Sequence, residues 1–275
     1  MTDFLAQYGL LILALIGCGL FSGLAAGLFG IGGGAIIVPV LIILFESLGY
    51  SETASHVAIA TSLATIILTS ARSVMAHHER GAVDWYVVKT WAPWIMLGAI
   101  AGQLLAGELS SIALKGFFGA MAFLLAAQLF FGRPSWKLAE DMPRGAGRAG
   151  LGGGIGVLSA LMGIGGGTFG VSLMTICGKP IHKAVATAAG FGIAIGLPSA
   201  FTAIYTGWGQ EGLPPFSLGY VNLAAFAVIS IFTVTMAPVG ARLAHSLDAA
   251  LLKRLFGILL ALVAAKMLWD VFTGG

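Results

Sequence analysis

The chain has 275 residues, of which 58% are hydrophobic and only 9% charged, and its mean hydropathy is +0.98. Ordinary soluble domains carry about 25% charged residues, so this composition excludes a soluble globular protein and indicates a chain suited to lipid. The formal net charge of +3 is divided among short segments without a continuous basic face, so no nucleic-acid partner is expected.

Ten apolar segments follow one another along the chain. The first five cover roughly residues 8–29, 33–48, 56–76, 83–106 and 113–131, and the second five cover roughly 149–163, 166–177, 183–206, 218–243 and 250–272. No Lys or Arg precedes the first segment, so it is expected to stay as a membrane helix and not to be a cleaved signal peptide. We therefore predict an all-α polytopic membrane protein.

The second segment of each half is short. At 1.5 Å per residue, a helix over 166–177 cannot cross the ~30 Å of bilayer hydrocarbon. Segments one and two of each half are then either a re-entrant pair or two tilted spans. The expected number of transmembrane segments is accordingly eight to ten.

Three sequence blocks occur twice, in the same order. Gly23–Leu41 aligns with Gly156–Met174, and both contain the pentapeptide Gly-Ile-Gly-Gly-Gly. The other blocks pair residues 56–61 with 182–187 and residues 114–119 with 252–257. This pattern predicts two five-segment repeats, residues 1–131 and 150–275, joined by a cytoplasmic linker at 132–149. An odd number of segments per repeat makes the repeats inverted.

The basic residues predict the orientation. If the N-terminus lies outside, twelve of the fourteen Lys and Arg residues fall on or near the inner side, as the positive-inside rule requires. They are Arg72, Arg80, Lys89, Arg133, Lys137, Arg144, Arg148, Lys179, Lys183, Arg242, Lys253 and Arg254. The loops with Glu46, Glu52, Glu108 and Glu211 are then external, and so are both termini.

The two glycine pentapeptides carry the strongest functional signal. Lipid cannot satisfy exposed backbone groups, so such breaks occur at membrane depth only where protein or a water-filled cavity surrounds them, as in many secondary transporters. Free N–H groups at a helix start bind anions without a fixed charge. The candidate substrate-binding residues here are Gly32, Gly33 and Gly34 in the first repeat and Gly165, Gly166 and Gly167 in the second. Close helix packing through small residues is the alternative interpretation.

Hydroxyl and proline residues of the third segments extend the candidate site. Thr61 and Ser62, with Thr187 as the repeat mate of Thr61, could donate hydrogen bonds to an oxyanion or bond their own helix carbonyls. Pro198, next to Ser199, is expected to kink its helix and shape a cavity.

Two histidines, His56 and His182, are repeat mates at the start of the third segments. They are candidates for proton coupling, because histidine titrates near neutral pH, or they are simple helix-end residues. The run His77–Arg80 lacks metal-site spacing and is expected in a solvated loop. No metal, cofactor or catalytic residue is expected, and no Asp or Glu lies at the centre of an apolar segment.

Several of these segments resemble the sulfite exporter TauE/SafE family. The resemblance rests on residues 27–41, their partner at 160–172, and the blocks beginning at His56 and His182, and it covers essentially the whole chain. Two departures are Ser172, where the repeat mate of Pro39 would stand, and Ala188, where the mate of Ser62 would stand. The resemblance implies a bacterial inner-membrane permease that moves sulfur-containing anions such as sulfite, sulfonates or thiosulfate. In such a membrane, the external termini that the basic residues predict would be periplasmic.

The residues predict a duplicated transporter with an anion-binding, glycine-rich centre that works by alternating access, and the resemblance adds small sulfur-containing anions as the substrates. An anion channel with a glycine-lined pore is the main alternative, and a structural or sensory subunit is another. A membrane-embedded enzyme is not expected, since no nucleophile–base or metal constellation is found. The expected partners are a small anion and the lipid bilayer, and a homodimer is left open.

Overall fold

The computed structural model describes residues 2–131, 139, 141–244 and 249–273. Within these residues the chain forms ten α-helices and one short β-hairpin. The first five helices are α1 (Thr2–Phe29), α2 (Gly34–Ser47), α3 (Ala54–His78), α4 (Trp85–Glu108) and α5 (Ser111–Phe131). They are followed by α6 (Gly145–Met162), α7 (Gly167–Ile176), α8 (Ile181–Thr206), β1 (Ser217–Leu218), β2 (Val221–Asn222), α9 (Leu223–Leu243) and α10 (Ala249–Thr273).

Several of these helices have the length and composition of membrane spans. In the described part of the chain, five stretches qualify: Leu11–Phe29, Ala54–His78, Ser111–Gln128, Ile181–Thr206 and Leu223–Leu243. The predicted fold class, an all-α polytopic membrane protein, is confirmed. The helices α2 and α7 have only 14 and 10 residues, or about 21 and 15 Å, and are too short to cross the hydrocarbon.

Two helices begin at residues other than the limits of the expected segments. The segment expected from residue 218 begins with the β-hairpin, and α9 starts only at Leu223, because Asn222 caps the helix by accepting from the N–H of Ala225. The linker expected over 132–149 is already helical from Gly145, where α6 begins. Most of the remaining linker lies outside the described residues.

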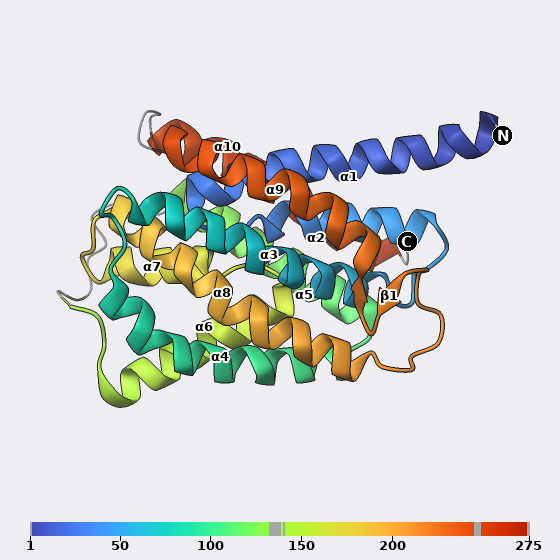
Figure 1. The fold of residues 1–275 in the computed structure, drawn as a ribbon. Helices are drawn as coiled ribbons and strands as arrows, with labels where there is room; N and C mark the ends of the chain where they lie inside the picture. The colour runs from blue at the N-terminus through green and yellow to red at the C-terminus, as the bar shows by residue number, and fades with distance from the viewer. Residues whose placement is uncertain (1, 132–138, 140, 245–248, 274–275) are drawn as a thin grey trace.

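The helices run roughly along one direction, and the two termini lie at the same end of the bundle (Figure 1). The loops before α3 and after α8 are at this terminal end, and the α3–α4 loop is at the opposite end (Figure 1). From the terminal end, α1 runs into the bundle and α2 turns back toward the end from which α1 came. The long helices α3 and α8 are the most enclosed spans, and they pack on each other.

Glycines allow two helix pairs to approach closely. In the α1–α9 pair, a Cβ added at Gly27 would overlap the carbonyl oxygen of Ala237. In the α4–α6 pair, a Cβ added at Gly156 would overlap the carbonyl oxygen of Ile95. Under the predicted duplication, α1 corresponds to α6 and α4 corresponds to α9. The α1–α9 and α4–α6 pairs are therefore equivalent: in each, the first helix of one repeat packs on the fourth helix of the other repeat.

Candidate functional site

The two glycine pentapeptides form loops that touch each other. The first loop joins α1 to α2, the second joins α6 to α7, and all residues of both pentapeptides are buried. The N–H of Gly165 donates to the carbonyl oxygen of Ile31 at 3.1 Å, which links the loops directly.

The backbone of the loops needs glycine. Gly32 and Gly33 have φ angles of +73° and +85°, and Gly163 has +64°. Side chains other than hydrogen are strained in this left-handed region. The sequence therefore places glycine where α1 and α6 must end and the chain must turn back.

The contact itself is backbone against backbone. A Cβ at Gly34 would overlap the carbonyl oxygen of Gly163, and a Cβ at Gly167 would overlap that of Gly30. A Cβ at Gly165 would stand 2.7 Å from the carbonyl oxygen of Ile31. The packing interpretation of these glycines thus has direct geometric support.

The loops also bring two helix N-termini together. Helix α2 begins at Gly34 and α7 begins at Gly167, so the positive ends of both helix dipoles meet at the loop contact. Within the described residues, the N–H groups of Gly32, Gly33, Gly166 and Gly167 donate to no protein acceptor. Buried, unpaired N–H groups at a positive helix end are suited to an anion.

The side chains around the loop glycines carry no charge. Those nearest the positions where a Cβ would stand are Ser22, Val38, Ser62, Ile66, Ser70, Val185, Phe191 and Ile195. Any negative charge at the loops would thus be stabilised by backbone dipoles and hydroxyl groups.

Ser62 is the candidate hydroxyl that reaches a loop. Its Oγ donates to the carbonyl oxygen of Gly163 at 2.7 Å, and the residue is fully buried. Its hydrogen is therefore used to hold the second loop in place.

The hydroxyl groups of Thr61 and Thr187 each bond to the start of another helix. Thr61 Oγ1 accepts from the N–H of Asn222 at 2.9 Å, just before α9. Thr187 Oγ1 accepts from the N–H of Asp84 at 3.0 Å, just before α4. The sequence analysis did not predict these hydrogen-bond partners, because they come from distant parts of the chain.

Pro198 and Ser199 lie in the buried interior of α8. Ser199 is one helical turn after Ile195, whose side chain borders Gly166, so it continues the face of α8 that meets the second loop. Its Oγ is fully buried and has no hydrogen-bond partner in the described part of the protein. A buried hydroxyl without a partner is a natural contact for water or a ligand.

The two candidate histidines have different surroundings. His56 is buried at the terminal end, where its Nε2 lies 2.9 Å from the carbonyl oxygen of Leu109 and its ring stacks on Tyr220. A carbonyl only accepts, so Nε2 carries the hydrogen. Burial raises the pKa of Tyr220, which keeps the phenol neutral. His182 is exposed near the start of α8, at the opposite end.

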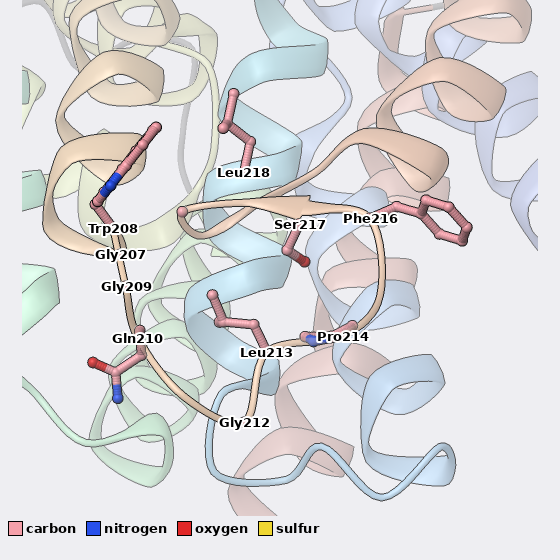
Figure 2. A pocket seen from close by; sticks show the side chains of 11 residues that line it. Gly207, Trp208, Gly209, Gln210, Gly212, Leu213, Pro214, Phe216, Ser217 and Leu218 are labelled. Carbon is pink, nitrogen blue, oxygen red and sulfur yellow. The ribbon is translucent and has the colours of Figure 1, made fainter.

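An open hollow of about 450 Å³ lies at the loop between α8 and the hairpin. It is lined by residues 207–210, 212–214 and 216–219, and Figure 2 shows Trp208 and Phe216 on opposite sides of this loop. None of the predicted site residues lines it.

Several polar residues with structural partners were missed by the sequence analysis. Asp84 and Asn222 cap α4 and α9 through their side chains, and Lys179 pairs with Asp84. Asp and Asn directly before an apolar helix are capping signals that could have been recognised. His77 was expected in a solvated loop, which was wrong: it lies in the last turn of α3 and is buried, with Nε2 3.3 Å from the carbonyl oxygen of Gly27.

Comparison with known proteins decides the family. A family model described as sulfite exporter TauE/SafE matches residues 15–267. The chain belongs to the sulfite exporter TauE/SafE family. A probable membrane transporter protein of Haemophilus influenzae is 33% identical over 259 residues, which cover 93% of this chain and 97% of the relative. A probable membrane transporter protein of Methanocaldococcus jannaschii is 25% identical over 269 residues, which cover 95% of this chain and 97% of the relative.

This TauE/SafE chain is accordingly a multi-pass membrane transporter and not an enzyme. No solved structure is significantly similar to it. In the described residues, no group of three or more His, Cys, Asp and Glu side chains is arranged to hold a metal ion.

Proposed function

We propose that the protein is a secondary transporter of small sulfur-containing anions, such as sulfite, sulfonates or thiosulfate, and that the substrate binds at the two glycine loops. The observation that carries the proposal is the meeting of two helix N-termini, with unpaired N–H groups of both loops, in an uncharged and buried setting. The sulfur chemistry comes from the family, whose model is described as a sulfite exporter.

The binding groups are the backbone N–H groups of the loops, with Ser199 as a further donor. Gly32, Gly33, Gly166 and Gly167 supply N–H groups, and helix dipoles add partial positive charge without a lysine or arginine. Among the described residues, the side chains that border the loop glycines are uncharged. An anion held by partial charges alone is released more easily than one paired with a lysine or arginine, which suits a transporter.

The transport mechanism we propose is alternating access, with one half of the bundle rocking against the other. The interface between the loops supports this, because it is made of backbone contacts and one interloop hydrogen bond, Gly165 to Ile31. Separation of the loops would open space for an anion between two helix N-termini. The exchanged helix pairs α1–α9 and α4–α6 support two inverted repeats as the moving units.

The test is thermal stabilisation of the detergent-purified protein by anions. The panel contains sulfite, thiosulfate, sulfate, sulfoacetate, taurine and acetate as the carboxylate control. A saturable rise in melting temperature is expected for a sulfur anion, since a ligand that binds only the folded state stabilises it. Loss of one hydrogen bond in Ser199→Ala should weaken the apparent affinity about three- to tenfold.

A matched control is Ser230→Ala. Ser230 is also a buried serine whose Oγ has no partner in the described residues, but it lies on α9. Its substitution should leave anion binding unchanged. Equal weakening by both substitutions, or the absence of any anion-dependent shift in well-folded protein, would contradict the proposed site.

An anion channel is the second candidate, because a glycine-lined centre could also serve as a pore. Proteoliposomes separate the two functions. A transporter shows saturable uptake and counterflow, in which internal unlabelled anion drives entry of labelled anion. Flux that rises linearly with concentration and shows no counterflow would establish the channel instead.

A further inference from the structure

Two polar clusters connect the central helices to the starts of other helices. We name them clasps. The terminal-end clasp consists of Thr61 of α3 and Asn222, the capping residue of α9. The opposite-end clasp consists of Thr187 of α8, Asp84, the capping residue of α4, and Lys179 of the α7–α8 loop.

The clasps share one hydrogen-bonding scheme. In each, a buried threonine hydroxyl accepts the backbone N–H of the capping residue, at 2.9 Å for Asn222 and 3.0 Å for Asp84. In each, the capping side chain accepts from an N–H three residues later in its helix. Thr61 and Thr187 are repeat mates, so each clasp ties a third helix of one repeat to the fourth helix of the other.

The clasps differ in what holds the capping side chain. Asn222 is 4% exposed, and its Nδ2 donates to the carbonyl oxygen of Pro215 at 2.9 Å and to Ser217 Oγ at 3.2 Å. The carboxylate of Asp84 instead lies 3.3 Å from the Nζ of Lys179, and these two side chains are 32% and 33% exposed. One clasp is neutral and buried, whereas the other is ionic and partly open to solvent.

This difference predicts which clasp releases more easily. A partly exposed ion pair contributes little and is weakened further by salt. Opening the buried clasp would leave Thr61 Oγ1 and the backbone N–H of Asn222 without partners in a buried place, which is more costly. The opposite end of the bundle should therefore open before the terminal end.

We propose that the two clasps are the gates of the transport path, and that the Asp84–Lys179 ion pair is the latch of the gate that opens first. Separation of α8 from α4 requires release of Thr187 from Asp84, and separation of α3 from α9 requires release of Thr61 from Asn222. This inference rests on the proposed alternating access, but not on the identity of the anion.

The test measures solvent access with cysteine probes at repeat mates. Ala58 and Ala184 are fully buried and precede Thr61 and Thr187 by three residues, so each shares a helix face with its clasp. Ala58→Cys and Ala184→Cys are each made in a background with Cys18→Ala and Cys177→Ala. The readout is the rate of reaction with a small, hydrophilic thiol reagent in lipid nanodiscs, with no anion substrate present.

Lys179→Gln should speed the labelling of Ala184→Cys about two- to fivefold and leave Ala58→Cys unchanged. Asp84→Asn keeps a capping oxygen and should have the same effect as Lys179→Gln. The double substitution should add nothing further, because both substitutions remove the same interaction.

High salt should speed the labelling of Ala184→Cys when Lys179 is present, and it should not change the labelling rate of Ala184→Cys in the Lys179→Gln variant. The control is Lys266→Gln, which breaks the Lys266–Asp270 pair of α10 and should change neither rate.

Equal acceleration at both probes, or no response to Lys179→Gln and to salt, would overturn the gate assignment. The salt titration on Ala184→Cys needs no substitution in the clasp itself, so it decides even if Lys179→Gln or Asp84→Asn folds poorly. Labelling that follows the prediction in a protein that no sulfur anion stabilises would leave the gates standing and remove the proposed substrate.

Discussion

His56 and His182 occupy equivalent positions in the two repeated blocks, yet their side chains are in unlike environments. His56 is enclosed between the Leu109 carbonyl and the ring of Tyr220, and its Nδ1 is buried without a partner in the described structure. His182 is exposed. Protonation of His56 would place a charge in a buried site. We therefore expect any proton coupling through the pair to depend on His56.

Replacement of the two histidines tests this coupling. His56→Gln keeps a donor for the Leu109 carbonyl but removes the titratable ring, so it should abolish the response of anion transport to a pH gradient. His182→Gln should leave that response intact. The measurement is anion uptake by proteoliposomes with and without an imposed gradient. Unaltered pH dependence in both variants would remove the coupling hypothesis.

At the residue scale, the roles of the loop glycines were easier to predict from the sequence than the roles of the hydroxyl residues. A twice-repeated glycine run can be read locally, since it marks positions where a side chain is not tolerated. The roles of Thr61 and Thr187 depend on Asn222 and Asp84, which are more than a hundred residues away in sequence. No local pattern reveals which capping residue meets which threonine, so these hydrogen-bond partners could not be predicted from the sequence.

At the element scale, the half-length helices α2 and α7 give the fold its central contact. Each begins immediately after a glycine loop, and each carries its N-terminus to the other loop. Ten segments were recognised from apolar length alone, because a helix that faces lipid must be apolar over most of its surface. The hairpin before α9 was missed, since Ser217–Asn222 is short and continues an apolar run.

Alanine substitutions measure the loop contact. In Gly34→Ala the new Cβ would meet the backbone of the second loop at Gly163 and Ile164, which cannot move aside easily. Overpacking of this kind costs about 1–3 kcal/mol, so the melting temperature should fall by several degrees. Gly154→Ala is the control, because Gly154 is helical and has open space around it. Equal melting temperatures for the two variants would show that the loops are not in firm contact.

At the scale of the whole molecule, several exposed basic side chains lie at one end of the bundle. The exposed Arg80, Lys183 and Arg242 lie at or near helix ends opposite the termini, whereas Glu52 and Glu211 lie in loops at the terminal end. This separation supports the orientation that we propose: both termini in the periplasm and the opposite end in the cytoplasm. The two equivalent helix pairs, α1–α9 and α4–α6, support the proposed inverted repeats.

Labelling of intact cells with a membrane-impermeant maleimide tests the orientation. In a background with Cys18→Ala and Cys177→Ala, Ser51→Cys in the exposed α2–α3 loop should react in cells whose outer membrane is permeabilised. Glu79→Cys, in the exposed α3–α4 loop, should react only after the inner membrane is opened. The reverse pattern would place the termini in the cytoplasm.

The loop contact also has a genetic consequence. Every single-nucleotide missense change in a glycine codon adds a side chain, and at Gly34, Gly165 and Gly167 the added atom meets backbone of the facing loop. Elsewhere in a membrane helix, one apolar side chain can often replace another. In a saturation library selected for transport, the centre of this protein should therefore appear as two short intolerant stretches, surrounded by helices that accept many exchanges.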